Sequence, residues 1–376
     1  MLNLIGKPAD IAHPILGIIT NKNVGFFHRH KHILVTSRVD GNWGRYAGVI
    51  TTSSNPRELA SVPHVYGLST DEITKLCDGD IVLIETNGMV NQIWDSDAPH
   101  NALLATEDCN CCCIMCPQPR KKDLEDKTNL NIRVIRLLDP KRTTSLGITG
   151  GEPTLLGNGL VKLIVECKKR LPHVPILLLT NGKRFEDISY VEKISAIGHD
   201  ITFGIPLYSD NDTEHDRIVG AKGSFYQTVE GITNLARYKQ KIEIRNVLLK
   251  PNFNRLPQFA EYVYRNFPFV IHVAFMGMET TGLALKNLDK IWIDPMTYMT
   301  KLREAVLHLY RRELRVSIYN LPLCIIPKEL WTFSRKSISV WKNIYIEACN
   351  QCTVKEKCCG FFSTSGGHMS SGIKPI

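Results

Sequence analysis

The hydrophobic and polar positions of residues 1–98 follow the short, alternating runs that are typical of β-strands. Ile81–Thr86 and Met89–Trp94 are two such runs, and Asn87-Gly88 lies between them. Because Asn-Gly readily takes the positive φ angles of a type I′ turn, the pattern predicts a β-hairpin. We therefore expect residues 1–98 to form a small, mostly β domain without a catalytic constellation of its own.

From residue 99 onward, apolar strands alternate with segments of helical period. The predicted strands are Ala102–Thr106, Ser145–Thr149, Pro175–Thr180, Ile201–Leu207, Ile242–Leu249 and Phe269–Met276. The predicted helices are Leu124–Leu138, Leu160–Leu171, Ile188–Ile197, Phe225–Tyr238, Leu256–Asn266 and Thr297–Arg311. Such β/α units predict a parallel sheet covered by helices. The sheet either closes into a partial barrel or lies flat as a doubly wound sheet, and periodicity does not decide between the two.

Three polar or cysteine-rich segments fall at the ends of predicted strands. They are Thr106–Cys116, Gly150–Pro153 and Thr180–Gly182. The carboxyl ends of parallel strands meet at one edge of a sheet, and that edge is where such folds bind ligands. We therefore expect the three segments to lie together at a ligand site.

Composition narrows the class of protein. The chain has 376 residues, is 43% hydrophobic and carries a formal net charge of +9, with 46 Lys and Arg against 37 Asp and Glu. The basic residues are scattered, so we expect a solvated surface and no nucleic-acid binding. No run approaches the roughly 18 apolar residues of a membrane span, and no signal-peptide pattern opens the chain. We expect a soluble, cytoplasmic protein with no membrane partner.

The cysteines are clustered. Five of the twelve lie within Cys109–Cys116 and five within Cys324–Cys359. Clusters of this kind are unusual for a disulfide scaffold in a chain this long, and they indicate metal or iron–sulfur ligation in a reducing compartment.

The first cluster contains a C-x3-C-x2-C spacing through Cys109, Cys113 and Cys116. Three thiolates in one loop can hold three corners of a cubic cluster and leave one iron open for catalysis. The alternatives are unligated buried thiols, a zinc site and a disulfide. Cys111 and Cys112 lie inside the motif and are either idle or alternative ligands.

This loop resembles the hallmark motif of the radical S-adenosylmethionine (SAM) superfamily. The resemblance implies a partial (β/α)6 barrel, a [4Fe–4S] cluster on the three cysteines and SAM on the open iron. Gly150, Gly151, Glu152 and Pro153 look like the superfamily's glycine-rich motif, in which Glu152 would accept a hydrogen bond from the SAM ammonium.

Further SAM contacts are weaker extensions of the same resemblance. Asn181 follows the third strand, and Arg245 on the fifth could reach the SAM carboxylate or ribose, although an ion pair with a structural carboxylate is an equal alternative. Met115 stands where the superfamily often has an aromatic residue, which leaves adenine packing open.

The second cysteine cluster combines Cys324 with a C-x2-C-x5-C spacing through Cys349, Cys352 and Cys358. A structural zinc is one interpretation. The spacing also resembles the SPASM and twitch extensions, which carry auxiliary [4Fe–4S] clusters. Phe362 replaces a further cysteine of the full SPASM pattern, so the resemblance implies one auxiliary cluster. Cys359 is an alternative ligand to Cys358.

Over most of its length the chain resembles the C-type radical SAM maturases of the His-Xaa-Ser peptide system. The motifs that carry the likeness are Cys109–Pro119, Thr149–Leu156, Gly204–Tyr208, Phe275–Gly282 and Ser337–Lys342. The resemblance implies a precursor-peptide substrate, a partner radical SAM maturase and an electron donor such as flavodoxin or ferredoxin. Glu279 would contact substrate or SAM, or form a structural ion pair.

We therefore expect three domains: residues 1–98, a radical SAM barrel at 99–312 and a cluster-bearing extension at 313–376. Two alternatives remain for function. One is a radical SAM enzyme that acts on another protein or a small molecule, and the other is a zinc-stabilised interaction protein without catalysis.

Overall fold

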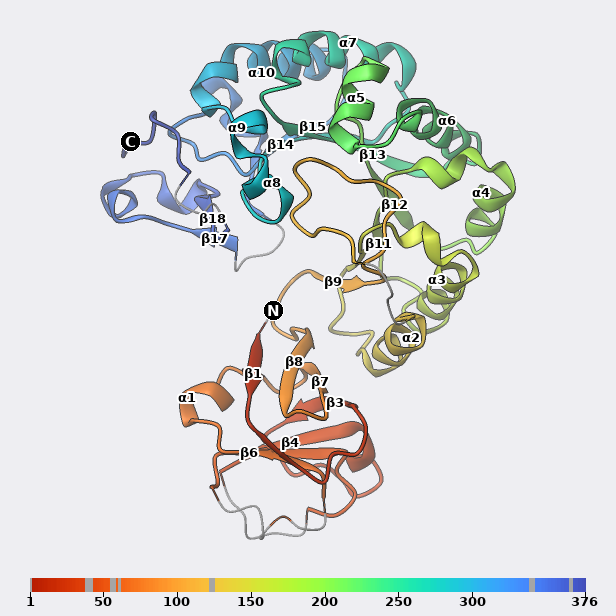
Figure 1. Cartoon of the computed structure of the whole chain (residues 1–376), viewed down its shortest axis with the longest axis vertical. Coiled ribbons are helices and arrows are strands. Elements are labelled where there is room, and N and C mark those ends of the chain that lie inside the picture. Colours follow the sequence, from red (N-terminus) through yellow and green to blue (C-terminus); the bar gives the residue numbers. More distant parts are fainter. Residues whose placement is uncertain are drawn as a thin grey trace. The chain divides into compact units, whose positions relative to one another are not determined.

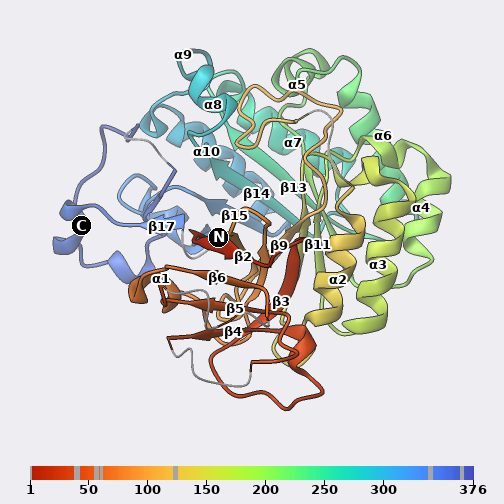
Figure 2. The ribbon, with the colours of Figure 1, turned by 60° about the horizontal axis from the view of Figure 1, so that its bottom comes forward.

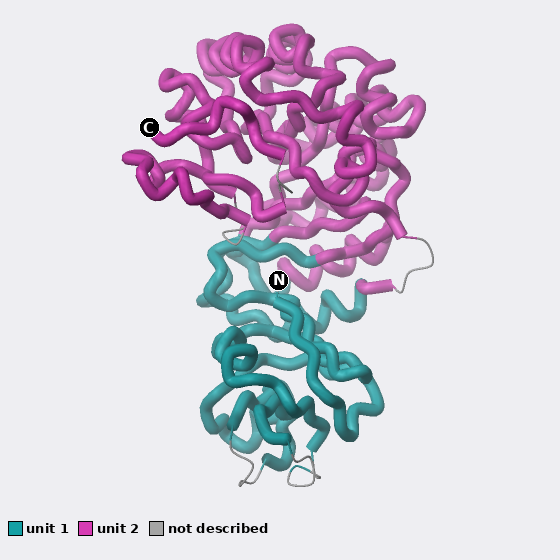
Figure 3. The backbone as a smooth tube through the Cα atoms, turned by 60° about the vertical axis from the view of Figure 1, so that its left-hand side comes forward, with its two compact units in different colours: residues 1–103, 128–146, 169–174 teal, residues 104–127, 147–168, 175–376 magenta. Residues whose placement is uncertain are grey.

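A computed structural model describes residues 2–37, 43–54, 59, 62–121, 126–337, 342–364 and 368–376. Residues 338–341 of the Ser337–Lys342 motif and the first two residues of the predicted helix Leu124–Leu138 lie outside these ranges. The chain divides into two compact units (Figure 3). Unit 1 comprises residues 1–103, 128–146 and 169–174, and unit 2 comprises residues 104–127, 147–168 and 175–376.

Unit 1 is built on a sheet with the strand order β1-β8-β7-β3-β4-β5-β6-β2. Its elements are β1 (Asn3–Ile5), β2 (Lys7–Ala9), β3 (Ile15–Thr20), β4 (His32–Thr36), β5 (Gly48–Thr51), β6 (His64–Tyr66), α1 (Thr70–Ile73), β7 (Ile81–Ile84), β8 (Met89–Trp94) and α2 (Thr128–Leu137). Alternate strand residues, among them Ile33, Ile50 and Val82, form its buried core.

The predicted hairpin is present, but the predicted turn type is wrong. β7 and β8 pair antiparallel, with Ile84 opposite Val90. Gly88 has a φ of +84°, whereas Asn87 is not among the described residues of positive φ. The Gly88 N–H donates to the Glu85 carbonyl over 3.0 Å, so the connection is a longer turn in which only the glycine needs the left-handed conformation.

The second sheet runs in the order of the sequence, from β9 to β16. Its strands are β9 (Asn101–Leu104), β10 (Leu146–Thr149), β11 (Ile176–Leu179), β12 (Ile201–Pro206), β13 (Lys241–Leu248), β14 (His272–Gly277), β15 (Val316–Tyr319) and β16 (Ser334–Arg335). Neighbouring strands from β11 to β16 pair in parallel. A doubly wound sheet would reverse its order at a switch point, so the sequential order identifies a partial barrel.

Helices follow the strands and form the outer layer of this sheet (Figures 1 and 2). They are α3 (Asn158–Arg170), α4 (Ile188–Ser195), α5 (Asp212–Val219), α6 (Ser224–Arg237), α7 (Leu256–Asn266), α8 (Leu283–Lys286), α9 (Leu288–Ile291) and α10 (Pro295–Tyr310). In α7 the buried residues Leu256, Phe259, Ala260 and Val263 recur at helical spacing and form the stripe that faces the sheet.

Two strands beyond the six predicted ones extend the sheet. β15 and β16 lie in residues 313–376, and unit 2 therefore includes both the barrel and this C-terminal region. Past β16, β17 (Asn343–Ile344) and β18 (Phe361–Phe362) pair antiparallel around the second cysteine cluster. None of the described helices is long and apolar enough to cross a membrane.

Candidate active site

The loop after β9 is fixed by backbone hydrogen bonds from two directions. Cys112 N–H and Ile114 N–H donate to the carbonyls of Val219 and Ile218 at the end of α5, each over 2.9 Å. On the other side, Leu283 N–H donates to the Cys116 carbonyl over 2.8 Å. In Figure 1 the loop runs along the inner side of the arc of helices, between α5 and α8. The fold thus holds this cysteine loop at the carboxyl ends of the strands.

Cys109, Cys113 and Cys116 are partly buried free thiols of this loop, and Cys116 and Cys109 lie near enough to Cys113 to influence its pKa. Cys109 and Cys113 pack against an apolar cluster that includes Met115, Tyr208 and other buried side chains. Burial, together with the neighbouring Cys116 and Cys109, raises the pKa of Cys113 to about 12. Burial also raises the pKa of Cys116. These thiols therefore hold their protons at neutral pH until a metal replaces them.

The donor set fits an iron–sulfur cluster, since thiolates are the usual protein ligands of such clusters. In the described part of the chain, no group of three or more His, Cys, Asp or Glu side chains is arranged as a metal-ion site. The fit of a cluster thus rests on the number, chemistry and proximity of the thiols in the loop.

Gly150 and Gly151 bring the end of β10 against the segment that leads into the cysteine loop. Gly151 N–H donates to the Thr106 carbonyl over 2.8 Å, and Glu152 N–H donates to the Asp108 carbonyl over 2.7 Å. A Cβ atom on Gly151 would lie 2.1 Å from the Asp108 oxygen, and one on Gly150 would lie 2.4 Å from the Thr106 oxygen. The two glycines therefore permit this backbone pairing.

Glu152 is fully buried, and protein groups bond both of its carboxylate oxygens. Oε1 accepts hydrogen bonds from Thr154 N–H, Thr154 Oγ1 and Thr180 Oγ1, and Oε2 accepts one from Asn181 N–H over 2.6 Å. Burial raises the pKa of this carboxyl group, while the bonds from Thr154, Thr180 and Asn181 oppose that shift. Glu152 thus joins the end of β10 to the end of β11. Pro153 follows it, buried, in a single 3-10 turn.

Asn181 reaches the cysteine loop from the end of β11. Its Nδ2 donates to Asn110 Oδ1 over 2.6 Å and lies 3.6 Å from Cys111 Sγ. Lys183, two residues further, is buried and places its Nζ 3.9 Å from the same sulfur atom. The segments after β9, β10 and β11 therefore meet at one place, as their positions at strand ends predicted.

Arg245 lies on the face of β13 that also carries Glu243 and Val247. Its Nε lies 3.6 Å from Glu243 Oε1, and its Nη2 donates to Met276 Sδ over 3.4 Å. Val247 from this face packs against the apolar cluster that contains Cys109 and Cys113. Arg245 thus forms the structural ion pair that the sequence allowed, and it does so on the strand face that leads to the cysteine loop.

Cys324, Cys349, Cys352 and Cys358 line one largely apolar cavity. Cys324 follows β15, and the other three lie between β17 and β18. The structure therefore gathers four thiols from separate segments, a donor set that fits either a cubic cluster with protein ligands on every iron or a zinc ion.

Cys358 and Cys359 have different surroundings. Cys358 Sγ accepts hydrogen bonds from the backbone N–H groups of Leu323 and Gly360, each over 3.3 Å. Contacts from the Cys359 thiol and from these N–H groups lower the pKa of Cys358 to about 6. Cys359 is buried, does not line the cavity, and donates its S–H to the Leu321 carbonyl over 3.1 Å.

Other sequence-based hypotheses are resolved by contacts. Glu279 pairs with Lys342, whose Nζ lies 3.0 Å from both carboxylate oxygens, and it also accepts a bond from Thr364 Oγ1. The ion-pair alternative is therefore the observed one. Asp216 in α5 accepts hydrogen bonds from the Gly223 and Phe225 N–H groups and so caps the start of α6.

Sequence reasoning missed Lys183 and Gly220, and it named Gly282 only as the end of a motif. A Cβ on Gly220 would lie 2.5 Å from the Cys112 oxygen, and one on Gly282 would lie 2.4 Å from the Pro117 oxygen. Both glycines therefore support the cysteine loop from segments remote in sequence. Lys183 directly follows the quoted Thr180–Gly182 segment, but lysine is rarely buried, so its sequence position alone carried no signal.

Comparison with known proteins agrees with this geometry. Residues 103–263 match the model of the Radical SAM superfamily. Two similar solved structures are crystal structures of Streptococcus suis SuiB, bound to S-adenosylmethionine and bound to the precursor peptide SuiA. Each is 17% identical over 59% of this chain, with a TM-score of 0.50, and they are covered to 51% and 49% respectively. The chain thus spans about half the length of these proteins, and the likeness shows the fold.

A comparison with curated protein sequences found no match. The family model covers β9 through most of α7, the part of the barrel that carries the cysteine loop, the two glycines, Asn181 and Arg245. Residues 103–263 of this chain therefore match the radical SAM superfamily, and they lie within a fold that is similar to that of SuiB.

Proposed function

We propose that this protein is an enzyme that reductively cleaves SAM and uses the resulting radical to modify a ribosomally made peptide. The observation that carries the proposal is the close approach of the Cys109–Cys116 loop to the segments after β10 and β11. Three thiols for a [4Fe–4S] cluster thereby lie next to backbone and side-chain groups suited to a small polar ligand.

In this proposal Cys109, Cys113 and Cys116 hold the cluster, and its open iron takes SAM. Once reduced by one electron, a cluster held by these cysteines would supply the chemistry that cleaves SAM to methionine and a 5′-deoxyadenosyl radical. Gly150, Gly151 and Asn181 orient the methionine part of SAM. Arg245 offers its guanidinium to the SAM carboxylate or ribose from the inner face of β13.

Met115 and Glu152 act on either side of this ligand. Met115 is buried in the apolar cluster beside the thiols, which supports a role in excluding water from the adenine site. Glu152 holds the ends of β10 and β11 together through its four hydrogen bonds, so it acts on SAM through the backbone that it positions.

For the C-terminal region we propose an auxiliary [4Fe–4S] cluster on Cys324, Cys349, Cys352 and Cys358. Four protein ligands leave no open iron, which suits electron transfer or ordering of the substrate site. The two N–H···S bonds to Cys358 support it, rather than Cys359, as the fourth ligand.

The proposed substrate is a precursor peptide of the His-Xaa-Ser type. The SuiB fold, solved with a precursor peptide, supports a peptide substrate, and the sequence motifs support this peptide class. A flavodoxin or ferredoxin would supply the electron, and a partner maturase would act on the same peptide. The alternative substrate is another protein or a small molecule.

The test is an anaerobic reaction of the reconstituted protein with SAM, a chemical reductant and a His-Xaa-Ser precursor peptide. We expect 5′-deoxyadenosine by chromatography and a modified peptide by mass spectrometry. A Cys113→Ala variant serves as the control without a complete cluster. Two zincs per chain with no iron or sulfide, or SAM binding without any 5′-deoxyadenosine, would contradict the proposal.

A further inference from the structure

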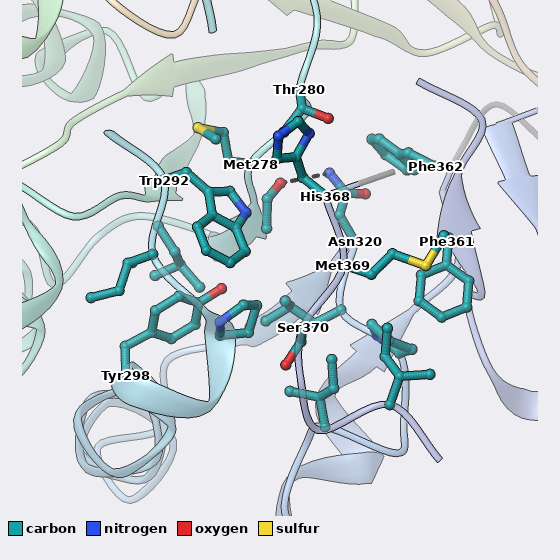
Figure 4. Close-up of a pocket in the computed structure, with 18 of the residues that line it drawn as sticks. Met278, Thr280, Trp292, Tyr298, Asn320, Phe361, Phe362, His368, Met369 and Ser370 are labelled. Carbon is teal, nitrogen blue, oxygen red and sulfur yellow. Dashed lines mark hydrogen bonds between the residues drawn. The ribbon is translucent and has the colours of Figure 1, made fainter. Parts of the chain in front are cut away.

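A pocket next to the candidate active site is partly filled by the end of the chain itself (Figure 4). Its walls include Met278, Thr280, Trp292 and Tyr298, and the segment His368–Ile373 contributes four further lining residues. Met278 also packs against the apolar cluster that contains Cys109 and Cys113. The pocket therefore adjoins the place where we propose that the radical forms.

One carboxylate holds this terminal segment through three hydrogen bonds. Ser370 Oγ donates to Asp294 Oδ1, and Ser371 donates to Asp294 Oδ2 through its N–H over 2.9 Å and its Oγ over 2.7 Å. Asp294 also accepts a bond from Met296 N–H at the start of α10. The carboxylate is therefore fixed by the helix and directed toward serine side chains.

The residue two positions before Ser370 enters the pocket. The His368 ring meets the Trp292 ring edge-on, with centroids 6.5 Å apart and planes at 61°. Figure 4 shows this imidazole beside Trp292 and Thr280. After the serines, Gly372 passes so near Met296 that a Cβ atom would lie 2.6 Å from its sulfur. The contacts thus involve an imidazole and a hydroxyl two residues later.

The last residues are anchored separately. Thr353 N–H and Thr353 Oγ1 each donate to the Ile376 carbonyl over 2.8 Å, and Lys374 and Pro375 line the cavity of the second cysteine cluster. His368 and Met369 are exposed to solvent, so contacts in the pocket cover them only in part. The end of the segment is therefore attached by contacts that do not involve residues 368–372.

We propose that this pocket is the binding site for the substrate peptide and that His368–Gly372 occupies it as a stand-in for that peptide. In the bound peptide, Asp294 accepts the hydrogen bond of the serine hydroxyl and Trp292 packs against the histidine ring. His368 and Ser370 have the spacing of a His-Xaa-Ser peptide, which is the substrate proposed above. The identity of the natural ligand therefore rests on the proposed function. A peptide must displace the chain's own segment in order to bind.

The test is a binding measurement under anaerobic conditions with the full chain. The probe is a fluorescent peptide of sequence Gly-His-Met-Ser-Ser-Gly, and its control is Gly-Ala-Met-Ala-Ala-Gly. A double variant Ser370→Ala/Ser371→Ala loses the bonds that retain the segment, so we expect it to bind the probe about fivefold more tightly or better. Asp294→Asn, which keeps a helix cap, removes the charged acceptor and should bind about tenfold more weakly than that double variant.

Ser189→Ala is the matched control, because it also removes a Ser-to-Asp hydrogen bond, in this case to Asp187, the N-cap residue of α4. We expect its affinity to equal that of the unchanged chain. Equal affinity of the double variant and the unchanged chain would overturn the inference and leave the segment as a structural cover. So would equal binding of the probe and the alanine peptide.

The same proteins are assayed for 5′-deoxyadenosine formation. Loss of peptide selectivity with intact SAM cleavage refutes the pocket and leaves the proposed chemistry standing. Selective peptide binding without SAM cleavage refutes the chemistry and leaves the pocket standing. The two failures are therefore distinguishable.

Discussion

Cys358 and Cys359 are neighbours in the sequence, yet their sulfur atoms have different partners. Cys358 faces the cavity and accepts two backbone N–H groups, whereas Cys359 donates to the Leu321 carbonyl. N–H···S bonds stabilise thiolate character, which a metal ligand requires. A C-x2-C-x5-C spacing could not rank the two cysteines, because their difference depends on contacts with residues 321–323.

The first prediction compares these two cysteines. Cys358→Ser should lower the iron content of the anaerobically reconstituted protein from about eight to about four atoms per chain. Cys359→Ser should keep nearly all of its iron, because its thiol does not face the cavity. Iron and sulfide analysis of the two variants provides the measurement. The opposite pattern of loss would assign the ligand to Cys359.

His215 gives a second prediction, which concerns pH. Its ring is buried, its Nδ1 accepts a bond from Tyr208 N–H over 3.3 Å, and burial lowers its pKa from 6.5 to about 4. The unfolded chain therefore binds a proton below about pH 6.5 that the folded chain does not, so stability falls as the pH decreases from there toward 4.

At about pH 5 this group should cost about 2 kcal/mol of unfolding free energy relative to about pH 7. Urea unfolding at both pH values measures the loss. His215→Gln keeps an acceptor without the titration, so its loss between the two pH values should be smaller by that amount. An equal loss in both proteins would show that His215 does not titrate in this range.

At the scale of elements, β10 can approach the cysteine loop because Gly151 has no side chain. A Cβ on Gly151 would lie 2.1 Å from the Asp108 oxygen, so Gly151→Ala must push the two segments apart. Displacement of a reacting group by about 1 Å costs about a hundredfold in rate. We expect a loss of that order in 5′-deoxyadenosine formation. Gly25→Ala is the control, since nothing lies within 4 Å of its Cβ.

A comparison of predicted and observed helices and strands shows which elements the sequence pattern can predict. The predicted helix Leu256–Asn266 has the bounds of α7, because four apolar residues at helical spacing define it. The short α5 was missed, since Asp212–Val219 is largely polar and its apolar residues come only at the end. β15, whose run of four residues is interrupted by Ser317, was also missed.

The location of the candidate site could be predicted from the sequence, but the contacts within it could not. Motifs at strand ends predicted that the segments after β9, β10 and β11 would meet, and they do. The carboxylate of Glu152 shows why the details could not be predicted. Its partners Thr180 and Asn181 follow a different strand, so only the folded chain reveals that protein groups bond both oxygens.

At the scale of the whole molecule, cluster binding should stiffen particular segments. In a bound cluster, iron replaces the protons of the cysteine thiols and ties together the loops that carry them. Removing the iron should therefore make these loops more mobile. We expect faster hydrogen exchange in residues 105–121 and 342–364 of the iron-free protein. The β7–β8 hairpin of unit 1 should exchange at an unchanged rate. A change confined to residues 105–121 would contradict an auxiliary cluster.

The order of the second sheet has a further consequence. Cys324 directly follows the region of β15, and β15 and β16 are the last two strands of that sheet. If the chain were cut after residue 312, β14 would become an uncovered edge strand with unpaired N–H and C=O groups. Such an edge recruits other chains, so the shortened protein should aggregate. β15 and β16 therefore cover the β14 edge, and we expect a chain that lacks residues 313–376 to self-associate.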